Sequence, residues 1–151
     1  MRIITLNLNG IRSAAGKGLF EWLPRQQADI VCLQELKAQL PDLTPEMRAP
    51  QGFHGYFHAA EKKGYSGVGI YSRKAPDNVV EGMGVDEIDA EGRYLQADFG
   101  KLSVVSLYLP SGSSGPHRQA SRFRFLDAFL VHLRKLKARK QEIILCGDWN
   151  I

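Results

Sequence analysis

Short apolar runs separated by turn-forming residues dominate the pattern of hydrophobic and polar positions along the chain. Runs rich in β-branched and aromatic residues, bounded by glycine, proline or asparagine, predict strands. The predicted strands cover residues 2–8, 29–33, 53–58, 67–72, 94–99, 102–109 and 142–147. The dipeptide Gly100-Lys101 lies between two of these strands and predicts a hairpin.

A different periodicity predicts helices. Residues 117–140 carry apolar side chains three and four positions apart and predict one helix. Residues 16–27 predict a second helix with Leu19, Trp22 and Leu23 on one face, which Pro24 should end or kink. We expect residues 38–52 to form a surface loop or short helix, 74–92 an irregular connection and 111–116 a flexible loop. Hairpins mixed with βαβ units predict one domain over residues 1–151, of mixed-sheet α/β or α+β architecture.

Composition narrows the class of protein only moderately. Hydrophobic residues make up 44% of the chain and charged residues 24%, which is ordinary for a globular domain. No apolar run of about 18 residues is present, so we expect no membrane span and a cytoplasmic location. The net charge of +4 and pI of about 9.2 weakly favour a polyanionic partner such as nucleic acid.

Polar side chains follow three of the predicted strands at the point where each strand ends. These are carboxylates and amides, namely Asn7, Asn9, Gln34, Glu35, Asp148 and Asn150. A sheet brings such strand ends to one rim, where loops can shape a site. Oxygen-only ligands suit Mg²⁺ or Mn²⁺, with Glu35 as the first choice for a direct ligand.

Each of these motifs also has a plain structural explanation. Asn7-x-Asn9 could form a simple turn, Glu35 could be a solvated charge, and Asp148-x-Asn150 could cap a helix. The functional interpretation rests on the occurrence of all three motifs in one chain.

Seven ordered segments give the chain a close resemblance to the exonuclease III group of the endonuclease/exonuclease/phosphatase superfamily. They are TLNLNGIRSA (5–14), DIVCLQELK (29–37), KKGYSGVGIYS (62–72), DAEGRYLQADF (89–99), SLYLPSGSSG (106–115), RFRFLDAF (122–129) and IILCGDWNI (143–151). The resemblance implies a four-layer αββα sandwich of two mixed β-sheets flanked by helices. It also implies Mg²⁺-dependent hydrolysis of DNA phosphodiesters at abasic sites and 3′ ends.

The resemblance also implies roles for individual residues. Glu35 corresponds to the metal-binding glutamate of the family, with Asn7 and Asn9 on the metal side. Tyr108 corresponds to the tyrosine that contacts the scissile phosphate. Asp148 corresponds to the aspartate that orients or deprotonates the attacking water, and Asn150 to an amide that holds a phosphate oxygen.

The expected partner is double-stranded DNA with abasic sites or 3′ ends, bound by a monomer. Tyr65 and Arg93 correspond to family positions near the DNA. Among the cations in or beside predicted loops, Arg12, Lys62 and Arg118 are expected to share the rim with the site and to contact phosphates.

The chain departs from the family pattern in one respect. The family carries a later Asp-His pair that has no counterpart here, and the histidines His54, His58, His117 and His132 are expected to be loop or surface residues. The chain is therefore expected to be the N-terminal portion of the fold, with uncovered apolar faces and little activity alone. The alternatives are a superfamily cousin acting on other phosphoesters and a catalytically incomplete DNA-binding fragment.

Overall fold

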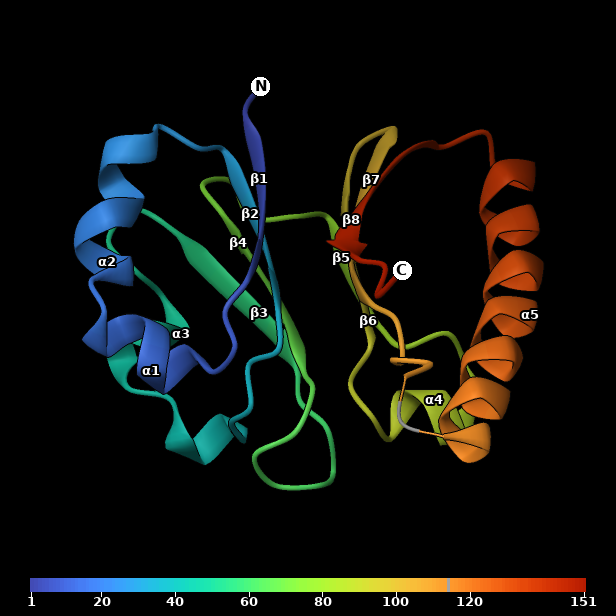
Figure 1. The fold of residues 1–151 in the computed structure, drawn as a ribbon. Helices are drawn as coiled ribbons and strands as arrows, with labels where there is room; N and C mark the ends of the chain where they lie inside the picture. Colours follow the sequence, from blue (N-terminus) through green and yellow to red (C-terminus); the bar gives the residue numbers. More distant parts are fainter. Residues whose placement is uncertain (114) are drawn as a thin grey trace.

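Two four-stranded sheets pack face to face at the centre of the molecule (Figure 1). The structure is a computed structural model that describes residues 1–113 and 115–151. The first sheet has the order β1 (Ile3–Asn7), β2 (Ile30–Gln34), β4 (Val68–Ser72) and β3 (His54–His58). The second has the order β5 (Asn78–Glu81), β6 (Tyr94–Phe99), β7 (Leu102–Tyr108) and β8 (Glu142–Asp148).

Helices form the two outer layers (Figure 1). Outside the first sheet lie α1 (Ile11–Gly16), α2 (Leu19–Trp22), α3 (Pro45–Arg48) and the 3₁₀ turns η1 (Leu23–Gln26) and η2 (Leu40–Asp42). Outside the second sheet lie α4 (Asp86–Asp89) and the long helix α5 (Pro116–Ala138). The four layers confirm the αββα sandwich predicted from the sequence, with both sheets mixed.

Three apolar clusters separate these layers. One, containing Ile11 and Leu33, fills the space between the first sheet and its helices. A second, containing Ile70 and Val104, lies between the two sheets. The third, around Phe125, joins the second sheet to α5. The alternation of side chains along each strand therefore supplies both faces of both sheets with buried residues.

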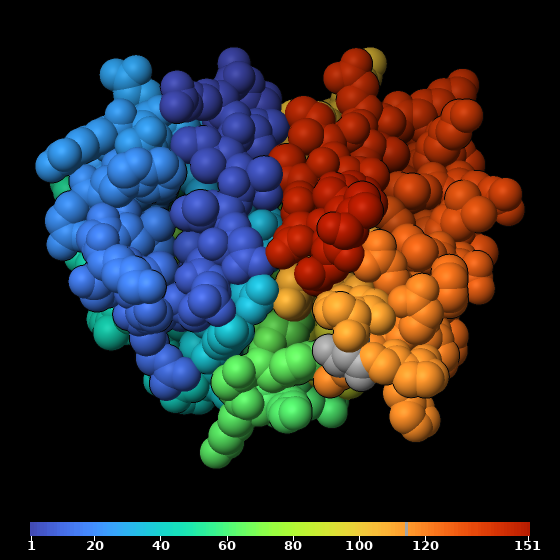
Figure 2. Space-filling view, viewed as in Figure 1, coloured from blue at the N-terminus to red at the C-terminus, as the bar shows by residue number. Residues whose placement is uncertain are grey.

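Parallel pairing in each sheet brings the functional strand ends to one rim. β1 runs parallel to β2 with Asn7 opposite Gln34, and β7 runs parallel to β8 with Tyr108 opposite Asp148. Gly147 is needed here because an added Cβ would lie 2.1 Å from the carbonyl oxygen of Leu107. The space-filling view shows the chain around β1 meeting the C-terminal segment on this side of the molecule (Figure 2).

Two predicted elements were wrong in detail. Residues 16–27 do not form one helix. Gly16 ends α1, Gly18 is left-handed with a φ of 96°, and Pro24 lies in the 3₁₀ turn that begins at Leu23. Trp22, predicted for the apolar face, is 39% exposed. The irregular connection 74–92 contains strand β5 and helix α4, both too short to give a periodic signal.

The predicted loop 111–116 includes residue 114, which lies outside the described residues. Pro116 already belongs to α5, where its fixed φ suits the first turn. Exposed apolar side chains occur on α5 and β8, including Leu130, Val131 and Ile144. Within residues 1–113 and 115–151, no helix has both the length and the apolar character that crossing a membrane requires.

Candidate active site

A single side-chain amide joins the two sheets at the rim. The Nδ2 of Asn7 donates to Oε1 of Glu35 at 2.8 Å and to Oδ2 of Asp148 at 2.7 Å. Asn7 ends β1, Glu35 follows β2 and Asp148 ends β8. Three residues far apart in the sequence thus converge at the strand ends, as the sequence predicted. Two carboxylates held on one amide form an acidic, oxygen-rich site.

The motifs Asn7-x-Asn9 and Asp148-x-Asn150 fold in the same way. The backbone N–H of Asn9 donates to Oδ1 of Asn7, and the N–H of Asn150 donates to Oδ1 of Asp148, both at 2.9 Å. These are Asx-turns, which explains the spacing of two residues. Asn150 itself is left-handed with a φ of 48°, and its Nδ2 donates to the carbonyl of Leu109.

Glu35 is the most closely surrounded carboxylate of the site. Its Oε2 lies 3.2 Å from Nζ of Lys37, and that Nζ also donates to Oδ1 of Asn9 at 2.6 Å. Partial burial alone would raise the pKa of Glu35, but hydrogen bonds from Asn7, Lys37 and Tyr108 together lower it below its ordinary value of 4.5. The site therefore holds Glu35 as a carboxylate at neutral pH.

Left-handed backbone conformations cluster at this rim. Asn9, Glu35, Lys37 and Asn150 have φ values of 46°, 53°, 49° and 48°. Asparagine tolerates this region, but it is uncommon for Glu and Lys. Such conformations persist only where the surroundings enforce them, and they concentrate at functional sites.

Tyr108 lies at the end of β7, with its half-buried ring beside both carboxylate-bearing segments. Burial, followed by the negative charge of Glu35, raises the pKa of its phenol to about 12. Its hydroxyl interacts with the side chains of Glu35 and Asn150. Tyr108 therefore keeps its proton near neutral pH and can act as a hydrogen-bond donor.

Gln34, one of the polar residues predicted to lie at the rim, is buried below it. Gln34 is only 1% exposed, and its Nε2 donates to Oγ of Ser106 and Oγ1 of Thr5, each at 3.1 Å. It therefore ties β1, β2 and β7 together beneath the site instead of orienting a ligand at the rim. Burial of its polar groups is compensated by these bonds.

Arg93 was predicted to contact DNA, and its burial corrects this. The residue is 2% exposed, and its guanidinium bonds Glu91, the Tyr65 hydroxyl and the carbonyl of Tyr108. Its Cζ also lies 5.1 Å from the centroid of the Tyr108 ring. Arg93 therefore supports Tyr108 from below. The sequence could not reveal this, because a buried arginine has no sequence signature separate from an exposed one.

Removing this buried cation has a measurable consequence for stability. We expect Arg93→Met to lower the free energy of unfolding by about 3 kcal/mol, since it leaves the Glu91 carboxylate without its partner. The control is Arg124→Met, whose pair with Glu87 is 54% exposed on both sides, so that solvent screens the pair and its loss should change the free energy of unfolding far less than Arg93→Met does. Urea titration followed by tryptophan fluorescence measures both. Equal losses would contradict the structural role of Arg93.

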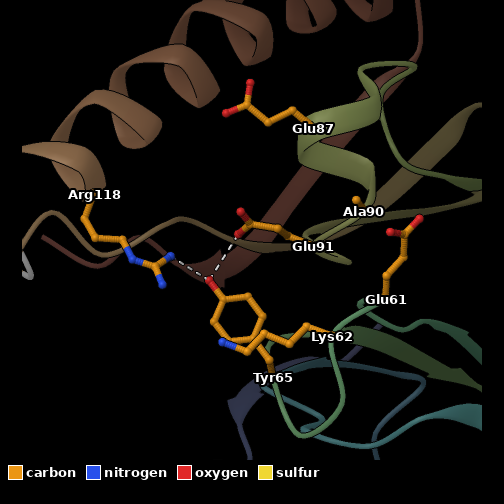
Figure 3. Close-up of a pocket in the computed structure, with 7 residues that line it drawn as sticks. All are labelled: Glu61, Lys62, Tyr65, Glu87, Ala90, Glu91 and Arg118. Atoms are coloured by element: carbon orange, nitrogen blue, oxygen red, sulfur yellow. Dashed lines mark hydrogen bonds between the residues drawn. The ribbon is translucent and has the colours of Figure 1, made fainter.

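The predicted DNA-contacting residues Tyr65, Lys62 and Arg118 lie together at the surface (Figure 3). The Tyr65 hydroxyl accepts from Nη1 of Arg118 at 3.0 Å and donates to Glu91 at 3.1 Å. Lys62 Nζ lies 5.3 Å from the centroid of the Tyr65 ring. These residues line a cavity of about 320 Å³ that also contains the carboxylates of Glu61 and Glu87, so its charge is mixed.

Arg12, the remaining predicted DNA contact, lies on α1. Its Nη2 donates to the carbonyl of Lys37 at 2.9 Å. A larger cleft of about 620 Å³ opens beside Asp148 and Asn150, and its other lining residues are Ser111, Gly112, Ser113, Gln119, Arg122 and Ile151. Hydroxyl groups and an arginine beside the candidate carboxylates are suitable donors for a phosphate.

Two histidines differ from the prediction that all four lie in loops or on the surface. His132 packs edge-on against Tyr94, and its Nε2 is 2.7 Å from the Tyr94 hydroxyl. His58 is also partly buried, with Nδ1 3.0 Å from the carbonyl of Tyr94. His54 and His117 are exposed.

The residues present fit a hard divalent cation. Among the described residues, no group of three or more His, Cys, Asp and Glu side chains could hold a metal. Mg²⁺ does not need such a group, because it keeps several waters and binds through one or two carboxylates. Glu35 and the Asn9 side-chain oxygen, which already share an ammonium group, supply that kind of ligand set.

Comparison with known proteins defines the class to which this fold and rim belong. The model of the Endonuclease/Exonuclease/phosphatase family matches residues 4–151. The chain therefore belongs to this family.

Individual relatives show which members of the family the chain is similar to. The chain is 38% identical to a protein named exodeoxyribonuclease from Bacillus subtilis, over 100% of this chain and 59% of that protein. An AP endonuclease structure from Archaeoglobus fulgidus matches 98% of this chain and 57% of its own, with a TM-score of 0.84 and 26% identity. A 3′-5′ exonuclease from Neisseria meningitidis gives a TM-score of 0.87 at 25% identity, covering 100% and 58%.

These relatives confirm the resemblance to the exonuclease III and AP endonuclease group. The chain spans a little over half the length of each of the three.

Proposed function

We propose that this chain provides the metal-binding and water-activating residues of a Mg²⁺-dependent DNA-repair phosphodiesterase. The reaction would be hydrolysis of the DNA backbone on the 5′ side of an abasic site, with related cleavage at 3′ ends. The names of the relatives, an exodeoxyribonuclease and an AP endonuclease, support DNA as the substrate. The basic character of the chain is in keeping with a polyanionic partner.

One observation carries the proposal. The amide of Asn7 holds the carboxylates of Glu35 and Asp148, one from each sheet, within hydrogen-bond distance of the same nitrogen atom. Two carboxylates brought this close repel each other, and a bound divalent cation would relieve that repulsion. Metal-assisted phosphodiester hydrolysis uses one such group for the metal and another for the attacking water.

The roles follow from the surroundings of each side chain. Glu35, with the Asn9 oxygen, would hold the cation, whose contribution when bound is Lewis acidity at the phosphate. Asp148 would accept a proton from the attacking water as the water oxygen bonds to phosphorus. The bond from phosphorus to the 3′ oxygen would break, and the departing 3′ oxygen would take a proton from solvent water to become a hydroxyl. Tyr108 would donate a hydrogen bond to a phosphate oxygen, and Asn150 would hold a second oxygen.

Loop and helix cations near this centre would contact the DNA. Arg12 lies on the side of the first sheet, while Arg118, Lys62 and Tyr65 lie at the cavity shown in Figure 3. These cations would neutralise phosphates along the duplex and make binding weaken with salt.

The test is cleavage of a duplex containing one abasic-site analogue, with Mg²⁺ or with EDTA. It uses the chain alone and a chimera that joins residues 1–151 to the part of the Bacillus subtilis relative that the chain does not match. We expect the chimera to cut the strand at the abasic site only with Mg²⁺, and the chain alone to do so weakly.

Other outcomes would redirect the proposal. A folded chimera that cuts RNA or other phosphodiesters but not abasic DNA would favour a cousin within the superfamily. A chimera that binds the duplex without cutting it would favour a catalytically incomplete DNA-binding module.

A further inference from the structure

The side-chain oxygens of Glu35, Asp148, Asn7 and Asn9 each contact a donor of the protein. Asn7 Nδ2 serves one oxygen of Glu35 and one of Asp148, and the N–H of Asn150 serves the other oxygen of Asp148. Two of the other oxygens are Oε2 of Glu35 and Oδ1 of Asn9. Both contact the same group, the ammonium of Lys37.

These donors differ in how easily they can leave. The amide of Asn7 is fixed at a strand end by its own bond from the N–H of Asn9, and the Asn150 donor is backbone. Lys37 reaches the site on a four-carbon stem, and its side chain is 39% exposed. It is therefore the donor that can withdraw into water with the least change elsewhere.

The ammonium of Lys37 contacts the two oxygens that are best placed for a divalent cation. A lysine ammonium is a compact, strongly hydrated positive charge that prefers carboxylate and amide oxygens, as Mg²⁺ does. The two cations cannot occupy the same pair of oxygens together, and they repel each other at short range.

We propose that Lys37 is a tethered cation that occupies the metal-side oxygens of the metal-free protein and is displaced when a divalent cation binds. This inference rests on the proposed function, because it assumes that Glu35 and Asn9 hold the metal. Lys37 then acts as a positioning residue. It keeps Glu35 and Asn9 together before the metal arrives, and it sets the metal affinity by competing for the same oxygens.

The backbone supports this assignment. Lys37 is held in a left-handed conformation with a φ of 49°, while its N–H donates to the carbonyl of Ser66 and its carbonyl accepts from Arg12. The chain on both sides of the lysine is thus anchored, which returns the ammonium to the site when the metal leaves.

The experiment is Mn²⁺ binding by the complete 151-residue chain, followed by the electron paramagnetic resonance signal of free Mn²⁺. We expect Lys37→Gln to bind Mn²⁺ roughly tenfold more tightly than the unaltered chain, because it removes the competing charge. Lys37→Arg, which keeps the charge, should remain within about threefold of the unaltered chain. Lys101→Gln is the matched control, since it removes one charge at the β6–β7 turn, at the far end of β7.

A double-variant cycle with Glu35→Gln separates competition from a general charge effect. If Lys37 acts through Glu35 and Asn9, its replacement should change Mn²⁺ affinity much less in the Glu35→Gln background. Equal or weaker binding by Lys37→Gln would overturn the inference while leaving the metal site intact. Failure of both the unaltered chain and Lys37→Gln to bind Mn²⁺ would overturn the metal site itself, and the inference with it.

Discussion

Replacing Asp148 by Asn lowers the rate of abasic-strand cleavage by the chimera by about 10²- to 10⁴-fold, the range that general-base catalysis contributes. Asn7 and Asn150 donate to different oxygens of Asp148. An amide of the same shape can accept only one of these two hydrogen bonds, and it cannot take a proton from water. The loss should therefore be in kcat, with little change in KM. Single-turnover cleavage of an abasic duplex at saturating Mg²⁺ measures it.

The control for this prediction lies on α5. Asp127 is exposed on the helix, so Asp127→Asn changes the charge equally and should leave the cleavage rate within about twofold. If Asp148→Asn retained the full rate, the proton-accepting role would have to be assigned to another group.

Replacing Glu35 by Gln should weaken Mn²⁺ binding to the 151-residue chain by at least about 100-fold, because a neutral amide oxygen replaces the carboxylate ligand. Glu142→Gln, at the opposite end of β8, is the matched control and should leave the affinity unchanged. Isothermal titration with Mn²⁺ compares the two variants directly. Comparable affinities for them would show that the metal binds elsewhere.

The pH dependence of metal binding follows from the same carboxylate. Because the pKa of Glu35 lies below its ordinary value of 4.5, the group is ionised throughout the neutral range. A carboxylate whose pKa is lower in the folded protein than in the unfolded chain stabilises the fold at pH values above the unfolded-state pKa. This stabilisation is lost as the pH falls through the folded-state pKa. Because Glu35 keeps its charge between pH 8 and pH 6, titration of this group should not change the Mn²⁺ affinity over that range.

The sequence predicted the framework of the fold because strands and the long helix carry strong periodic signals. The seven predicted strands correspond to β1–β4 and β6–β8, and the helix predicted over residues 117–140 is α5. The elements that were missed or misplaced are β5, α4 and the divided helices α1 and α2, each of six residues or fewer. In such short elements tertiary contacts override local pattern.

The site was predictable to a different degree. Acidic and amide residues at strand ends revealed Asn7, Glu35 and Asp148, because parallel strands bring their ends to one rim. The ammonium of Lys37 and the burial of Arg93 and Gln34 were not predictable. Each depends on where a long side chain turns after the backbone is placed, and nothing in residue spacing fixes that direction.

Buried polar networks below the rim explain how the predicted residues hold their positions. Gln34 joins the sheets through Ser106 and Thr5, and Arg93 holds the strand end that carries Tyr108. Supporting shells of this kind restrict the rotamers of the groups above them. The site geometry is therefore a property of both sheets and not of the loops alone.

The central claim is that Glu35 and the side-chain oxygen of Asn9 hold one divalent cation near Asn7 and Asp148. The anomalous scattering of Mn²⁺ in crystals of the protein tests this claim most directly. The account predicts a single strong peak about 2.1 Å from a Glu35 carboxylate oxygen, with Asn7 and Asp148 around it and the Lys37 ammonium displaced. A peak at another part of the surface, or none at a Mn²⁺ concentration that saturates binding in solution, would contradict it.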